Sequence, residues 1–148
     1  MKKFVILLFA CSFITACGES SQSVDESAVA VKTITGTIEF RERIGLTRSS
    51  KLEIQLLDIS IADVPARIVA SKIIDNPGQA PFNFTIEYDP ALIVEQNTYS
   101  VSARIHDSGQ LILISDATNP VLTRDAPSTV NVEMVRVSSV TPIETEAQ

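Results

Sequence analysis

Apolar and polar residues alternate with a period of two through most of residues 33–137. The alternation is clearest in four segments, which are residues 33–40, 82–89, 99–106 and 130–135. A period of two is typical of antiparallel β-strands that have one buried and one solvated face. Three more strands, with less distinct faces, are predicted for aliphatic-rich runs at residues 52–58, 66–75 and 110–115.

Segments of turn-forming residues separate these runs. They lie at residues 47–50, 63–65, 76–78, 107–109 and 126–128. One helical turn is predicted after Asp89, because Asp89 can cap it while Pro90 takes its first position. This short connection, followed by Tyr99, resembles the corner at which a strand crosses between the sheets of immunoglobulin-like sandwiches.

About seven strands in about 105 residues predict an all-β domain. The expected arrangement is an antiparallel two-sheet β-sandwich of the immunoglobulin-like or transthyretin-like type. A small closed β-barrel is the alternative that the same pattern allows.

Residues 1–16 predict an export signal. Lys2 and Lys3 are followed by an almost entirely apolar run at residues 4–14. A helix of that length spans roughly 16 Å, which is about half of a ~30 Å hydrocarbon core. A signal peptide is therefore favoured over a membrane-spanning helix.

The segment Ile14-Thr15-Ala16-Cys17 resembles the lipobox of bacterial lipoproteins. The resemblance implies cleavage between Ala16 and Cys17 and attachment of lipid to the Cys17 thiol. Two or three acyl chains on one residue hold a protein on a membrane far more firmly than a single chain does. The alternative is ordinary signal cleavage after Gly18, because Ala16-Cys17-Gly18 loosely fits a small-x-small site.

The chain after the signal peptide is expected to have three parts. Residues 17–32 contain the lipidated cysteine and a flexible tether, because this segment begins polar, acidic and rich in Ser. Residues 33–137 form the β-domain, and residues 138–148 form a disordered tail. Gly18 follows Cys17, and by the sorting rule of enteric lipoproteins this favours the outer membrane, with the domain facing the periplasm.

The net charge argues against two kinds of partner. It is −6 for the whole chain and becomes −8 once Lys2 and Lys3 leave with the signal peptide. Phosphate binding needs clustered Lys and Arg, so no nucleic acid is expected, and anionic lipid head groups do not attract such a surface. Cys17 is the only cysteine after residue 16, so the mature chain has no partner for an intramolecular disulfide.

The sequence predicts no enzyme, no metal and no cofactor. His106 is the only histidine, whereas a metal site or a Ser-His-Asp triad needs further residues around it. No nucleophile elbow and no phosphate-binding glycine loop are present. Aspartates at strand ends are expected in turns, and paired catalytic carboxylates are the alternative for Asp58, Asp63, Asp89, Asp107 and Asp116.

The densest charge cluster is Arg41-Glu42-Arg43-Ile44. One interpretation is an exposed strand end whose charges compensate each other. The other is a partner contact through Arg41 and Arg43, because Arg is favoured at interfaces.

The run at residues 110–114 is apolar on both faces, so two of its aliphatic side chains should lie outside the core. If Ser108-Gly109 is a two-residue turn, Leu111 and Leu113 lie outside, with Arg104 at the rim of the patch that they form. A three-residue turn with Gly109 in a bulge would reverse the assignment. The outer pair is either covered by another part of the chain or belongs to a docking patch.

Several short motifs carry a family resemblance. They are RERIGL at 41–46, QLLDIS at 55–60, PFNF at 81–84, YDP at 88–90, YSVSARI at 99–105 and NPVLT at 119–123. Over about residues 34–135 the chain resembles the YbaY family of lipoproteins, which also contains the YscW-type pilotins of type III secretion. The resemblance implies a β-sandwich lipoprotein without catalytic residues, whose better-understood members help an outer-membrane secretin to assemble.

These observations together predict a non-catalytic, pilotin-like adaptor on the outer membrane. Its expected partners are membrane lipid, through acylated Cys17, and an envelope or secretion-system protein. The alternative function is a module that binds a small ligand or an envelope polysaccharide.

Overall fold

The structure, a computed structural model, describes residues 30–137. The predicted signal peptide, the Ala16–Cys17 cleavage and lipidation site, most of the predicted tether and the predicted tail at 138–148 lie outside the described residues. Within residues 30–137, no helix has the length and apolar character that crossing a bilayer requires.

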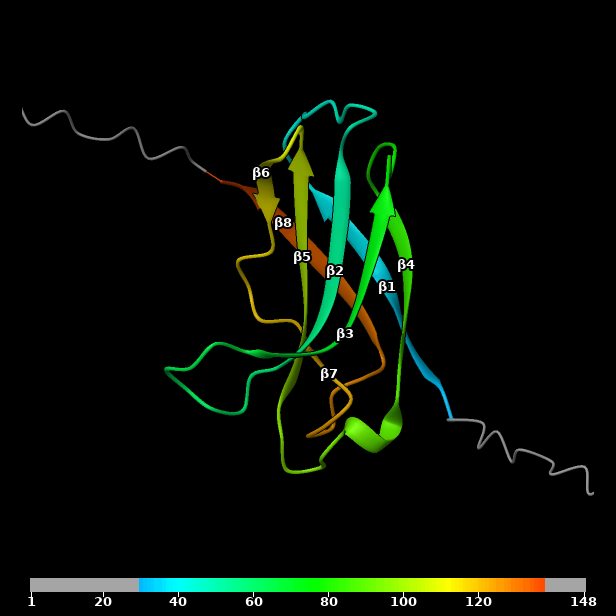
Figure 1. Cartoon of the computed structure of the whole chain (residues 1–148), viewed down its shortest axis with the longest axis vertical. Helices are drawn as coiled ribbons and strands as arrows, with labels where there is room; N and C mark the ends of the chain where they lie inside the picture. Colours follow the sequence, from blue (N-terminus) through cyan, green and yellow to red (C-terminus); the bar gives the residue numbers. More distant parts are fainter. Residues whose placement is uncertain (1–29, 138–148) are drawn as a thin grey trace, which may run out of the picture.

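Eight strands and one helical turn make up the described part of the chain (Figure 1). The elements are β1 (Lys32–Phe40), β2 (Lys51–Asp58), β3 (Arg67–Asp75), β4 (Phe82–Tyr88), η1 (Pro90–Leu92), β5 (Tyr99–Asp107), β6 (Gln110–Ile114), β7 (Pro120–Val121) and β8 (Thr129–Arg136). All seven predicted strands are present. The predicted helical turn is η1, and the Asp89 side chain caps it by accepting a hydrogen bond from the Ala91 amide at 2.8 Å.

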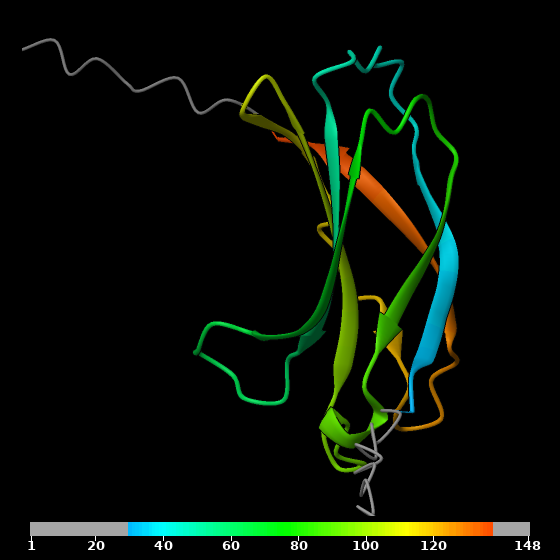
Figure 2. The same ribbon diagram turned by 45° about the vertical axis from the view of Figure 1, so that its right-hand side comes forward.

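The strands form a single sheet in the order β3-β2-β5-β6-β8-β1-β4, and β7 pairs with β5. The sheet curls until its two free edges, β3 and β4, come near each other without forming a ladder (Figures 1 and 2). The all-β prediction is confirmed. The nearly closed sheet is more similar to the small barrel, which is the alternative arrangement, than to a sandwich of two separate sheets. One pair departs from the antiparallel expectation, because β1 and β8 run parallel.

The two ends of this barrel differ in what they carry. At the entry end, β1 begins, and residues 59–66, η1, residues 93–98 and residues 122–128 connect the strands. At the far end, β1 finishes, and the connections are residues 41–50, 76–81 and 108–109. The strand β1 spans the two ends, and its nine residues reach about 30 Å.

The core lies inside the barrel and is built from the inward side of every long strand. Its fully buried members include Ile34, Leu56, Tyr99, Val101 and Val132. Gly36 lies on β1 between β4 and β8, where an added Cβ would meet the Val130 carbonyl oxygen and come within 2.7 Å of the Phe84 ring. Only glycine fits there, because the neighbouring backbone and the aromatic ring occupy the space of a side chain.

The β5–β6 hairpin corrects one prediction. Its turn has two residues, Ser108 and Gly109, with φ of 51° and 82°, as in a type I′ turn. His106 pairs with Leu111 as expected, but a β-bulge follows and Ile105 pairs with Leu113.

The extra residue of the bulge shifts the register, and the faces of the strand are therefore exchanged beyond it. Leu111 lies outside as predicted and is 36% exposed. The prediction that Leu113 also lies outside is wrong, because its side chain is fully buried in the core.

Candidate docking surface at the far end

The segment at residues 41–46 connects β1 to the turn before β2 and lies between two open grooves at the far end. One groove, of about 460 Å³, is lined by Phe40, Arg41, Glu42, Arg43, Ile44, Gly45, Gln79 and Ala80. The other, of about 300 Å³, is lined by Ile44, Gly45, Asp107, Gln110, Leu111, Ile112, Arg136 and Val137. A partner could therefore contact this segment from both sides. We name the segment with its two grooves the far-end surface.

Two ion pairs hold the segment against the end of β8. Arg41 Nε lies 2.5 Å from Glu133 Oε1, and Arg136 Nε lies 3.0 Å from Glu42 Oε2. These pairs are solvent-exposed, so each contributes about 0–1 kcal/mol and serves chiefly to orient the segment. Among residues 30–137, no carboxylate lies within ion-pair distance of Arg43, whose exposed guanidinium is therefore available to a ligand.

A second set of contacts joins the turn at residues 47–50 to the β5–β6 hairpin. Asp107 Oδ1 accepts hydrogen bonds from Thr47 Oγ1 at 2.5 Å and from Ser49 Oγ at 2.9 Å. The Thr47 hydrogen bond is the main reason why the pKa of the Asp107 carboxyl lies below its ordinary value, and Ser49 lowers it further. These contacts fix the hairpin that carries Leu111 beside the 41–46 segment.

The predicted contact residues are thus partly brought together. Arg41 and Arg43 line one groove of the far-end surface and Leu111 lines the other. Arg104 lies away from both, on the outer face of β5, where its Nη1 donates to Gln55 Oε1 at 3.5 Å. Leu113 is excluded by its burial. Partner contact by Arg41, Arg43, Arg104 and Leu111 remains a prediction.

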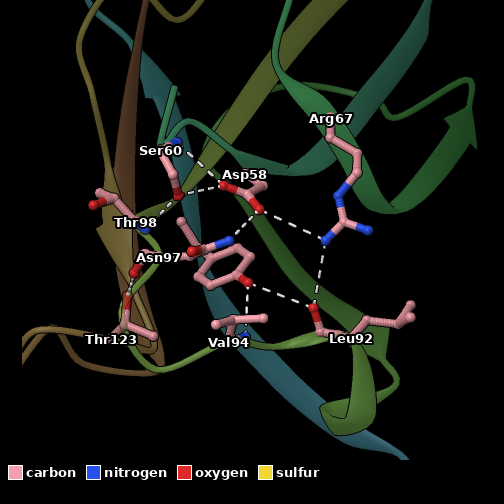
Figure 3. Close-up of polar contacts among 9 residues, drawn as sticks. Asp58, Ser60, Arg67, Leu92, Val94, Asn97, Thr98 and Thr123 are labelled. Atoms are coloured by element: carbon pink, nitrogen blue, oxygen red, sulfur yellow. Dashed lines mark hydrogen bonds and ion pairs between the residues drawn. The ribbon is translucent and has the colours of Figure 1, made fainter. Parts of the chain in front are cut away.

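A polar network at the entry end was not predicted (Figure 3). Its centre is Asp58, whose side chain is only 10% exposed. Asp58 Oδ1 accepts from the Ser60 amide at 3.1 Å and from Ser60 Oγ at 2.5 Å. Asp58 Oδ2 accepts from Asn97 Nδ2 at 2.8 Å and lies 3.6 Å from Arg67 Nη2. Asp58 therefore joins the loop after β2, the start of β3 and the segment before β5.

The electrostatics of this network favour the ionised carboxylate. Burial acts to raise the pKa of Asp58, but hydrogen bonds from Ser60 and Asn97, with the charge of Arg67, lower it below its ordinary value. Both carboxylate oxygens are thus occupied by donors from the protein. Among residues 30–137, no group of three or more His, Cys, Asp or Glu side chains is placed to hold a metal ion. The network is therefore interpreted as structural.

Tyr99 extends the same network toward η1 through contacts with Val94 and Leu92, which are labelled in Figure 3. The Tyr99 hydroxyl accepts a hydrogen bond from the Val94 amide at 2.9 Å and donates one to the Leu92 carbonyl oxygen at 3.4 Å. A buried tyrosine at the start of a strand, bonded to backbone a few residues upstream, is a tyrosine corner. The Tyr99 hydrogen bonds are those of the corner that the sequence around residues 89–99 resembles, but β4 and β5 belong here to one curled sheet rather than to two sheets.

The partners of Asp58 explain why this network was missed. The Asp58-Ile59-Ser60 segment does carry a local signal, because Asp often accepts from the amide two residues later in a turn. Arg67 and Asn97, however, come from segments that only the fold brings together.

Comparisons with known proteins agree with the fold and with the motifs. The model of a family described as "Type III secretion system lipoprotein chaperone (YscW)" matches residues 29–134. The lipoprotein YbaY of Escherichia coli (strain K12) is 29% identical over 108 residues. The match covers 72% of this chain and 57% of YbaY, so the chain spans little more than half the length of that relative.

A solved structure is also similar. It is described as an alternative pilotin from the type II secretion system of Vibrio cholerae, and it is 35% identical to this chain. The two folds agree with a TM-score of 0.70, over 74% of this chain and 99% of the pilotin chain. The family model covers well over half of the sequence and most of the barrel. The chain therefore belongs to the YscW family of lipoprotein chaperones.

Proposed function

We propose that this protein is a non-catalytic adaptor of the bacterial envelope, which binds a protein partner through its far-end surface. Acylated Cys17 holds it on the outer membrane, and the barrel faces the periplasm. The partner class is a protein of the envelope or of a secretion system, as for the relatives that are described as secretion chaperones and pilotins.

The observation that carries this proposal is the position of the far-end surface. The described chain begins at the entry end, whereas the far-end surface lies at the other end of β1, about 30 Å away. A partner can therefore reach Arg43 and the two grooves while the entry end faces the membrane. Exposed Arg43 supplies the bidentate donor that is favoured at protein interfaces.

A crosslinking experiment in intact cells tests the docking part. A photoreactive residue at Gly45 lies between the grooves, and an added Cβ there meets no atom within 4 Å. We expect a defined crosslinked protein that disappears when Arg43→Glu is added. The matched control is Arg124→Glu, the same charge reversal at the entry end, and it should leave the crosslink unchanged. Loss in both variants, or in neither, contradicts docking at the far end.

A separate experiment tests the anchor. Cys17→Ala should block lipid attachment and leave the unprocessed form, which detergent phase partitioning and electrophoretic mobility detect. A mature-size Cys17→Ala protein in the detergent phase would show that the lipobox interpretation is wrong. Density fractionation of envelopes then decides between the outer membrane, which Gly18 favours, and the inner membrane.

A further inference from the structure

Exposed aliphatic side chains gather at the entry end of the barrel. In the described part of the chain, ten large hydrophobic residues are exposed, and six of them lie at this end. The six are Val31, Ile61, Val64, Ile68, Leu92 and Val94, and the other four are Ile73, Leu111, Val135 and Val137. Ile61 is 71% exposed and Val31 is 56% exposed. This concentration at one end of the fold makes the entry end a candidate interaction surface.

The polar network described above holds the backbone of Leu92 and Val94, and that of Ser60 just before Ile61 (Figure 3). Leu92 and Val94 have their backbone groups bonded to the Tyr99 hydroxyl, and Arg67 Nη2 donates to the Leu92 carbonyl oxygen at 3.5 Å. Ile61 follows Ser60, whose hydroxyl bonds to Asp58 and to the Thr98 amide. The exposed side chains of Ile61, Leu92 and Val94 are therefore carried by backbone that hydrogen bonds hold in place.

The loop at residues 59–66 extends this surface sideways. It projects from the wall of the barrel near the entry end (Figure 2) and carries Ile61, Val64 and Pro65. Asp63 at its tip has φ of 62°, which fits the tight reversal of the chain there. Such a loop can enter a bilayer interface beside the body of the domain.

The course of the chain indicates what covers this surface. The described residues begin at Ala30, at the entry end, and Cys17 lies 13 residues earlier. As the flexible tether that the sequence predicts, a segment of that length would have an r.m.s. reach of roughly 20 Å. A lipid on Cys17 therefore keeps the entry end, rather than the far end, within reach of the bilayer.

The charged residues at the entry end restrict the kind of bilayer that this end can contact. The exposed carboxylates Asp63, Glu87, Glu95 and Asp125 lie at or near this end, together with Asp89. Within residues 30–137 the cations at this end are fewer, because Arg67 is paired with Asp58 and only Lys32 and Arg124 remain. Anionic head groups are thus not attracted, and contact with lipid has to come from aliphatic burial.

We propose that the entry end is a second membrane contact, in which Ile61, Val64 and the neighbouring aliphatic residues lie in the interface of a zwitterionic bilayer. This inference rests on the anchoring part of the proposed function. It adds a defined orientation, in which the barrel stands on its entry end and presents the far-end surface to the periplasm.

Single tryptophan probes test the inference, because the chain contains no Trp. Ile61→Trp places a probe at the entry end, and Arg48→Trp places a matched probe at an exposed far-end position. The lipidated full-length mature proteins are inserted into vesicles of brominated phosphatidylcholine. We expect the probe at 61 to emit at shorter wavelength and to be quenched severalfold more than the probe at 48.

Equal quenching of the two probes overturns the inference and leaves the apolar surface for a protein partner. Stronger quenching at 61 after an anionic lipid is added overturns the charge argument. If the purified mature protein carries no acyl groups, the proposed anchoring is contradicted, and the inference about the entry end is not yet decided. In that case the protein is coupled through its Cys17 thiol to a maleimide-bearing lipid in the same vesicles, so the two probes still decide whether the entry end contacts the bilayer.

Discussion

Lys72 and Thr85 join the two free edges of the sheet, because Lys72 Nζ on β3 donates a hydrogen bond to the Thr85 carbonyl oxygen on β4 at 2.8 Å. The register pairs Lys72 with Ile54, a fully buried residue of β2, so the lysine occupies the core side of an edge strand. An inward-pointing charge on an edge discourages pairing with another chain. A groove of about 440 Å³ remains beside it.

We expect Lys72→Ala to loosen the contact between β3 and β4, which we call the seam of the barrel, while the fold is retained. Loss of one exposed hydrogen bond should lower the free energy of unfolding by about 0.5–1.5 kcal/mol. Amide hydrogen exchange should rise in β3 and β4 and stay unchanged in β5. Lys51→Ala is the control, since Lys51 forms only an exposed ion pair with Asp75. Equal exchange in both variants would show that Lys72 does not hold the seam.

Gly36→Ala should be strongly destabilising. The added Cβ would meet the Val130 carbonyl oxygen and the Phe84 ring, so strands must shift, at a cost of about 1–3 kcal/mol or more. Gly45→Ala is the matched control, because a Cβ there meets nothing within 4 Å. Thermal unfolding of the two variants measures the difference, and similar melting temperatures would contradict the close packing around β1.

The bulge in the β5–β6 hairpin predicts opposite results for two leucines that are two positions apart. Leu113→Glu should prevent folding, because a carboxylate would be buried in the core without a partner. Leu111→Glu should leave the fold intact, since its side chain lies at the surface. Circular dichroism of the two proteins tests the register directly. A folded Leu113→Glu protein would instead support the bulge-free pairing, in which both leucines lie outside the core.

Asp58 predicts a pH dependence of stability. Its pKa in the folded state lies below the ordinary value of 3.8, so the folded state binds the proton less readily than the unfolded state does. The stabilisation is therefore complete above the unfolded value and declines as the pH falls through the folded value. The stability difference between the wild type and Asp58→Asn should be constant near neutral pH and should shrink as the pH falls below 3.8. A difference that grows in acid would contradict the lowered pKa.

The strands themselves could be predicted from sequence because burial of one face imposes a local period of two. Asp89 and Pro90 likewise predict η1 by local chemistry alone. Three features could not be predicted in this way. The strand β7 (Pro120–Val121) is too short to show a period. The bulge opposite His106 adds one residue to β6, and no residue type in the sequence indicates it. The parallel pairing of β1 with β8 joins segments that are distant in the chain.

The candidate site likewise has a part that the sequence predicts and a part that only the fold creates. The charge cluster around Arg41 and Arg43 is contiguous in the chain, so sequence alone located it. Sequence alone does not distinguish the two arginines. Arg41 is paired with Glu133 on β8, whereas Arg43 has no carboxylate beside it within residues 30–137. The Asp58 network depends equally on Arg67 and Asn97, which the fold brings to Asp58.

The place of β8 between β1 and β6 determines when the barrel can form during synthesis and export. Thr35 pairs with Thr129, 94 positions later, so the first strand lacks one of its two neighbours until the last strand is available. Closing such a long segment makes folding slow and late. A chain delivered from its N-terminus would present Cys17 for modification well before β8 emerges. Attachment to the membrane would then come first, and the barrel would close on a chain that is already held there.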